Sequence, residues 1–271
     1  MTPGRVAAGG APEEIIGARA LDGFEVEEVS REGVLRLTPW EALDPNIVCG
    51  ITMAARGDFG VAASSPARVA EAYGTLARGL GFGRVSVPTQ VHGTAIHEVP
   101  RRSGTEGAVP VVERAGRVDG QVTGARGCLL AATAADCVPM ALWSRATGRM
   151  GLVHAGWRGA AAGILVRALV GLWRTGGGAP GELRVHFGPA ICGGCYEVDR
   201  PVLAAFGFPG GRARLDLRGL LAGQALAAGV DHASISSSRH CTACGPIPLH
   251  SHRASGGKAG RMAAFLGRRR D

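Results

Sequence analysis

Residues 128–159 read CLLAATAADCVPMALWSRATGRMGLVHAGWRG, and this stretch decides the fold class. It contains three short apolar runs, at 128–133, 138–143 and 150–154, whose length is typical of buried strands. The last two runs are separated by Ser-Arg-Ala-Thr-Gly-Arg, a segment typical of a hairpin turn. A helix is predicted over 157–174, because its apolar residues recur at helical spacing.

The same patterns extend outward in both directions. Ser65 and Pro66 predict the start of an earlier helix, and a later helix is predicted over 216–228. Further strands are predicted at 35–37, 47–53, 85–87, 96–99, 118–122 and 183–187, and around Ile235. Helices therefore lie early and late, with strands between them, which predicts an α+β fold. We expect a single domain over residues 21–271, preceded by a flexible leader over residues 1–20.

Composition places the chain among globular proteins. It has 271 residues, of which 46% are hydrophobic and 19% are charged, which excludes a largely disordered chain. No apolar run approaches the roughly 18–20 residues of a membrane span. The first thirty residues show no basic head followed by an apolar core. We therefore expect a cytoplasmic protein with no membrane partner.

The formal net charge of +8 raises the question of a nucleic-acid partner. Lys258 is the single lysine among the 30 basic residues, and the arginines are scattered along the chain. Aromatic residues make up only 5%, so no stacking platform accompanies the positive charge. The charge is therefore interpreted as compositional bias, and no nucleic-acid partner is predicted. A positive field would still favour the capture of phosphate.

Three polar residues at predicted strand ends or turns form a candidate metal site. His92 lies in QVHG, Cys137 in TAADCVPM and His154 in GLVHAGWRG. Two imidazoles and a thiolate suit Zn²⁺, and three protein ligands leave a fourth position for water or substrate. The spacing matches no short metal motif. On spacing alone, two satisfied histidines and an inert thiol are the favoured interpretation.

The motifs QVHG, VDGQVT, TAADCVPM, GLVHAGWRG, FGPAICGGCYEV and CTAC…SHR…GRMAA occur in this order. From about Gly50 to the C-terminus, the chain thereby resembles the laccase-domain-containing family, once named multicopper polyphenol oxidases and now purine nucleoside phosphorylases. The resemblance implies one zinc ion per chain, bound by His92, Cys137 and His154. It also implies mixed sheets in a four-layer α/β/β/α sandwich. The implied reactions are phosphorolysis of adenosine, inosine, guanosine and methylthioadenosine, and deamination of adenosine.

These reactions require further polar groups. Deamination needs a carboxylate that moves a proton, and Asp136 or Asp119 is the candidate. Phosphorolysis needs a cationic cradle for phosphate, for which Arg158, one turn into the predicted helix, is the first candidate. Arg253 and Arg261 are weaker candidates. The structural alternatives are a turn cap for Asp119, an orienting role for Asp136, and a surface or packing role for each arginine.

A structural zinc site is one alternative to this interpretation. Cys192, Cys195, Cys241 and Cys244 form two CxxC pairs, a pattern typical of zinc ribbons. Ribbon pairs usually lie closer together in the sequence. The resemblance places Cys195 and Cys241 at family positions that need no second metal. A metal-to-chain ratio near two would favour the alternative.

Other functions also remain open. Cys137 could be the nucleophile of a cysteine hydrolase or deamidase, with His154 as its base. A copper-dependent polyphenol oxidase is disfavoured, because four coppers need several His-x-His pairs. Among the eight histidines, only His250 and His252 form such a pair. A non-enzymatic protein, stabilised by zinc and acting through a protein partner, is the remaining class, and the sequence does not identify such a partner.

Overall fold

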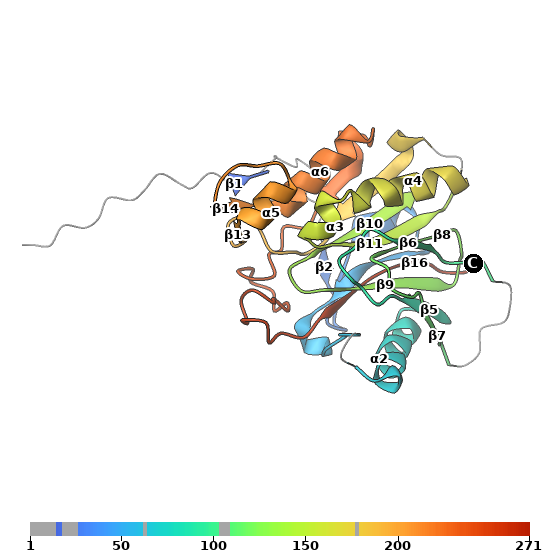
Figure 1. Ribbon diagram of the computed structural model, residues 1–271. Coiled ribbons are helices and arrows are strands. Elements are labelled where there is room, and N and C mark those ends of the chain that lie inside the picture. The colour runs from blue at the N-terminus through green and yellow to red at the C-terminus, as the bar shows by residue number, and fades with distance from the viewer. Residues whose placement is uncertain (1–14, 18–26, 62–63, 103–108, 177–178) are drawn as a thin grey trace, which may run out of the picture.

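The computed structural model describes residues 15–17, 27–61, 64–102, 109–176 and 179–271. They form a mixed α+β domain in which two large β-sheets lie between outer helices (Figure 1). The predicted α+β class and single domain agree with this arrangement. Most of the predicted leader lies outside the described residues. The exception is residues 15–17, where Ile15–Ile16 form a short strand, β1.

The larger sheet has seven strands in the order β2-β3-β4-β16-β9-β5-β7. Their bounds are Glu28–Val29, Val34–Arg36, Ile47–Thr52, Met262–Arg268, Cys128–Ala134, Arg84–Val87 and Val111–Arg114. The local sequence patterns did not predict β2, β7 or β16. β16 pairs antiparallel with β4 on one side and β9 on the other, so that Phe265 lies opposite both Gly50 and Ala131. The hydrogen-bond partners that stabilise β16 come from distant segments, which a local pattern does not reveal.

The second sheet has six strands in the order β15-β12-β10-β11-β8-β6. Their bounds are Ile235–Ser237, Leu183–Phe187, Val138–Ser144, Met150–Ala155, Gly120–Thr123 and Ile96–Glu98. The predicted hairpin of β10 and β11 is confirmed by their antiparallel pairing. β9 and β10 follow each other in the chain but belong to different sheets. Their connection, residues 135–137, therefore crosses between the sheets and carries Cys137.

A small third sheet joins the region near the N-terminus to a later part of the chain. Its order is β1-β14-β13, with β14 at Arg212–Leu215 and β13 at Glu197–Asp199. β1 is parallel to β14, and β13 is antiparallel to it. The described residues nearest the N-terminus thus pack against residues 212–215, far along the chain.

The α-helices are α1 (Thr38–Leu43), α2 (Pro66–Gly79), α3 (Trp157–Ala161), α4 (Ile164–Gly176), α5 (Arg200–Ala205) and α6 (Leu217–Ala227). Short 3-10 helices lie at Ala54–Arg56, Pro180–Glu182 and His232–Ser234. The predicted cap of α2 is confirmed, because the Ser65 hydroxyl accepts the Arg68 amide at 3.3 Å. None of the helices in the described ranges has the length and apolar character that a bilayer crossing requires.

The prediction of one uninterrupted helix over 157–174 is wrong. The structure ends α3 at Ala161 and begins α4 at Ile164. Gly163 has φ +78°, a left-handed conformation that glycine adopts at little cost and that ends a helix. The break turns α3 away from α4, so that the short helix packs beside the ligand loops.

Three apolar clusters fill the spaces between the layers. Tyr73 and Leu76 of α2 pack with Val85 and Phe265 on the outer face of the seven-stranded sheet. A second cluster lies between the two sheets. In the third, α4 and α6 cover the outer face of the six-stranded sheet. This order of layers agrees with the α/β/β/α sandwich that the resemblance implies.

Candidate metal centre

The three predicted ligands come together from three separate segments. His92 lies in the loop after β5, Cys137 in the connection between β9 and β10, and His154 near the end of β11. Their ligand atoms all lie within 4.8 Å of one another. Nε2 of His92 is 3.8 Å from Sγ of Cys137, and the centroids of the two imidazole rings are 4.9 Å apart. Two nitrogens and a sulfur at this spacing are compatible with one metal ion.

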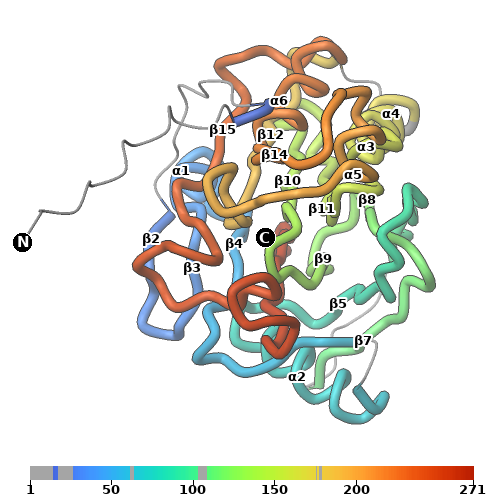
Figure 2. The backbone as a smooth tube through the Cα atoms, turned by 60° about the vertical axis from the view of Figure 1, so that its left-hand side comes forward, coloured from blue at the N-terminus to red at the C-terminus, as the bar shows by residue number. Residues whose placement is uncertain are grey.

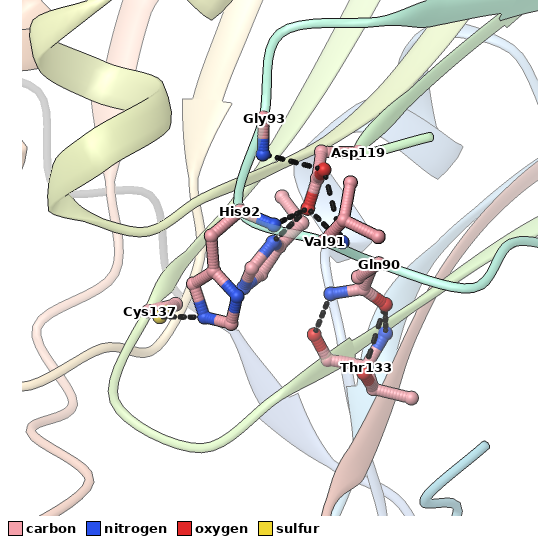
Figure 3. Close-up of polar contacts among 8 residues, drawn as sticks. Gln90, Val91, His92, Gly93, Asp119, Thr133 and Cys137 are labelled. Atoms are coloured by element: carbon pink, nitrogen blue, oxygen red, sulfur yellow. Dashed lines mark hydrogen bonds and ion pairs between the residues drawn. The ribbon is translucent and has the colours of Figure 1, made fainter. Parts of the chain in front are cut away.

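A buried carboxylate holds two of these ligands in place. Oδ1 of Asp119 lies 3.0 Å from Nδ1 of His154, which leaves Nε2 as the ring nitrogen available to a metal. The same carboxylate accepts the backbone N–H groups of His92 at 2.9 Å and Gly93 at 2.8 Å, as well as that of Val91 (Figure 3). Burial alone would raise the pKa of Asp119, but these hydrogen bonds outweigh it and lower the pKa.

Two residues of the site have an unusual backbone conformation. His92 has φ +59° and Asp136 has φ +85°, and they are the described non-glycine residues with positive φ. Such a conformation costs on the order of 1–3 kcal/mol, so the surroundings must hold it. Asp119 holds the His92 amide. The Asp136 carboxylate accepts the Thr242 hydroxyl and the Arg253 amide, each at 2.6 Å. Backbone strain is therefore located at one candidate ligand, His92, and at the residue that precedes another, Cys137.

The start of α3 approaches the ligands so closely that only glycine fits there. A Cβ at Gly156 would lie 2.6 Å from Cδ2 of His92 and 3.2 Å from Sγ of Cys137. A Cβ at Gly159 would lie 2.8 Å from the Gly93 carbonyl oxygen. The GLVHAGWRG motif thus supplies both a ligand, His154, and the small residues that let the other two ligands reach it.

Charge interactions within the trio favour a thiolate. Burial of Cys137 alone would raise its pKa, but the charge of His154 and hydrogen bonds from both histidines lower it to about 6. Burial of His154 alone would lower its pKa, but the Cys137 thiolate and Asp119 raise it to about 9. Because the thiolate is the form of cysteine that binds metals, the site is prepared for a cation near neutral pH.

A pocket of about 460 Å³ opens beside the trio. This volume lies within the range of small-molecule sites. The three ligands line it together with Asp58, Gly60, Val61, Gln90, Thr133, Ala134, Ala135, His252, Ala259 and Arg261. The loop before β16, which lies toward the viewer in red in Figure 2, supplies the last three. Neither Asp119 nor Asp136 is among these described lining residues.

Several pocket residues were not predicted from the sequence. Gln90 lies in the QVHG motif but was assigned no role. Its Nε2 donates to the Thr133 carbonyl at 2.8 Å, and its Oε1 accepts the Thr133 amide at 2.6 Å. This pair joins the ligand loop to β9. For Asp58, no motif or spacing in the sequence indicated a place in the pocket.

The three predicted phosphate-binding arginines lie in different places. Arg261 lines the pocket. Arg158 is exposed on α3, with its guanidinium 4.3 Å from the centre of the Trp157 ring. Arg253 is also exposed, 5.3 Å from the centre of the Tyr196 ring. The described lining of the pocket contains Arg261 but neither of the other two.

Comparison with known proteins identifies the family. Residues 57–269 match the family described as multi-copper polyphenol oxidoreductase laccase. The chain belongs to this family. It is 40% identical over 196 residues to the purine nucleoside phosphorylase YlmD of Geobacillus stearothermophilus, which covers 67% of this chain and 71% of that relative. It is also 31% identical over 212 residues to adenosine deaminase RL5 of an unknown prokaryotic organism, covering 72% and 79% of the two chains.

Solved structures of family members have the same fold. The crystal structure of YlmD from Geobacillus stearothermophilus matches with a TM-score of 0.77 and 34% identity, and covers 91% of this chain and 100% of that chain. The crystal structure of Bacillus licheniformis YfiH also matches with a TM-score of 0.77, at 25% identity. The predicted family and fold class are therefore confirmed.

Proposed function

We propose that this chain is a zinc-dependent enzyme that cleaves purine nucleosides with phosphate and deaminates adenosine. The observation that carries the proposal is the trio of His92, Cys137 and His154 at the wall of a pocket large enough for a small molecule. The names of the two relatives support the pair of reactions. The substrates expected from the resemblance are adenosine, inosine, guanosine and methylthioadenosine.

The residues fit a zinc ion, because a soft thiolate and two imidazoles are ligands that zinc prefers. A bound zinc ion would supply a Lewis acid at the wall of the pocket. Asp119 would orient His154 and the His92 loop through the hydrogen bonds described above. Asp136 would hold the connection that carries Cys137. We assign both carboxylates to positioning, because their oxygens are engaged with protein groups.

Asp58 is the carboxylate that reaches the pocket, and we assign proton transfer to it. Its Oδ1 accepts the backbone N–H groups of Gly60 and Arg261, each at 2.8 Å. This leaves Oδ2 available to a proton of the substrate. A carboxylate placed in this way can serve the deamination step without disturbing the ligand shell.

Arg261 is the arginine we assign to phosphate. It lines the pocket, and its NH1 group donates to the carbonyls of Ala259 at 2.8 Å and Gly260 at 3.1 Å. These bonds fix one edge of the guanidinium and leave its other donors for an oxyanion. Arg158 and Arg253 are assigned to the neighbouring surface around Tyr196. We propose the cytoplasm as the compartment, since a thiolate ligand is stable there.

The test uses purified protein with adenosine, in the presence and absence of phosphate, and chromatography of the products. We expect adenine only when phosphate is present and inosine in both cases. A chelator should abolish both products and zinc should restore them. His92→Ala should abolish turnover, whereas the exposed control His232→Ala should not. Turnover that survives the chelator but not alkylation of Cys137 would instead support the cysteine hydrolase, and restoration by copper alone would contradict zinc.

A further inference from the structure

Four cysteines that the proposed reaction does not use converge on one point outside the pocket. Cys192 and Cys195 lie in the connection between β12 and β13, and Cys241 and Cys244 lie in the loop after β15. Their sulfur atoms all lie within 4.8 Å of one another. The structure thus brings together the two CxxC pairs that are far apart in the sequence.

The sulfur spacing suits a metal ion and not a disulfide. None of the four cysteines forms a disulfide, and the sulfurs of Cys192 and Cys244 are 3.9 Å apart. A disulfide requires about 2.05 Å. Four sulfurs around a tetrahedral zinc ion, at about 2.3 Å from the metal, lie about 3.8 Å from one another. The observed separation is close to that edge length.

Both CxxC pairs fold as the same tight turn. In each pair, the residue after the second cysteine donates its amide to the carbonyl of the first: Tyr196 to Cys192 at 3.0 Å, and Gly245 to Cys241 at 3.0 Å. A Cβ at Gly245 would lie 2.4 Å from that second carbonyl oxygen, so the turn requires glycine. The amides of Cys192 and Ala243 also point at Sγ of Cys241, at 3.3 Å and 3.4 Å. Such donors stabilise negative charge on sulfur.

We propose that Cys192, Cys195, Cys241 and Cys244 bind a second divalent cation, a zinc ion, in a purely structural site. Four protein thiolates fill a tetrahedral shell and leave no position for a substrate. On binding, each cysteine that is still a thiol releases its proton to solvent, and the sulfur lone pair bonds to the metal. The site is separate from the trio and adds a second ion to the one already proposed.

The second ion would stabilise the connection that carries Cys137. Ile191, next to Cys192, donates its amide to the Asp136 carbonyl at 3.1 Å. Thr242, next to Cys241, donates its hydroxyl to the Asp136 carboxylate at 2.6 Å. Both CxxC segments therefore contact Asp136, the residue with positive φ that precedes the proposed metal ligand Cys137. Without the ion, the two CxxC segments are no longer joined to each other, and we expect Asp136 to be held less firmly.

The test measures metal content in the full chain, purified under reducing conditions, by elemental mass spectrometry. We expect about two zinc ions per chain in the wild type and about one in the double variant His92→Ala, Cys137→Ala. That variant leaves the four cysteines intact, so it reports on the proposed site even if the cysteine variants fail to fold. A ratio near one in the wild type that falls to zero in the double variant would overturn the proposal.

Variants of the second site give the complementary result. Cys192→Ser with Cys244→Ser should hold about one ion, whereas the core control Cys49→Ala should still hold about two. Reconstitution with Co²⁺ adds a spectroscopic readout. The double variant His92→Ala, Cys137→Ala should keep the intense visible absorption of tetrahedral cobalt bound to thiolates. Absence of that absorption, together with four thiols titrated by a thiol reagent in the presence of cobalt, would also overturn the proposal.

Discussion

Nδ1 of His154 lies 3.0 Å from Oδ1 of Asp119, and both side chains are buried. The pairing of β8 with β11 creates this contact. Val153 lies opposite Gly120, and the His154 amide donates to the Asp119 carbonyl at 2.7 Å. Because the Asp119 carboxylate also binds the amides of the His92 loop, one side chain sets the orientation of two metal ligands.

Asp119→Asn is expected to weaken metal binding by about 10–100-fold. The Asn side chain would place an NH2 group where a carboxylate oxygen accepts backbone N–H groups in the wild type, so the His92 loop would lose part of its anchor. Competition with a chromophoric chelator measures the affinity. The matched control is Asp231→Asn, an exposed residue far from the trio in the sequence, which should bind metal like the wild type. An unchanged affinity in Asp119→Asn would show that this carboxylate does not orient the ligands.

Gly156→Ala is expected to abolish metal binding at the trio while the fold remains. The new methyl group would lie 2.6 Å from the His92 ring, so this ligand must move. Circular dichroism and metal content measure the two effects. Gly79→Ala in α2 is the control, because its Cβ would meet nothing within 4 Å. It should be tolerated or should stabilise the chain by about 0.5–1 kcal/mol. Normal metal content in Gly156→Ala would refute the close approach.

In metal-free protein, Cys137 should react with iodoacetamide with a midpoint near pH 6, because its pKa is lowered to about 6. The thiolate fraction, and so the rate, increases as the pH rises through that value. Mass spectrometry of the labelled peptide measures the rate, with denatured protein as the reference at about 8.5. His154→Ala should move the midpoint upward, and zinc should protect the thiol. A midpoint near 8.5 in the folded protein would contradict the thiolate.

Thr242→Val should lower the free energy of unfolding by about 1–3 kcal/mol, because Oδ1 of the buried Asp136 carboxylate loses its hydrogen-bond donor while Oδ2 keeps the Arg253 amide. Turnover of adenosine should fall as well, since Asp136 precedes Cys137. Thr242→Ser retains the hydroxyl and is expected to restore both properties. Chemical denaturation and the product assay provide the measurements. Equal behaviour of the Val and Ser variants would mean that the hydroxyl has no such role.

The sequence alone predicted those features that depend on local pattern. The strands at β9, β10 and β11 follow from short apolar runs, and the α2 cap follows from Ser65 and Pro66. The sequence also indicated His92, Cys137 and His154 as residue types that can bind a metal. Family resemblance then connected these ligands with a single metal ion, which their spacing alone did not favour.

The tertiary structure decided what depends on contacts between distant segments. β16 is a strand because β4 and β9 offer hydrogen bonds on both sides, and Asp119 orients ligands because β8 pairs with β11. The positive φ angles of His92 and Asp136 are held by partners from other loops. The convergence of the four cysteines likewise required the loops after β12 and β15 to lie side by side. Local periodicity records which face of a segment is apolar, but it does not record which distant group will meet it.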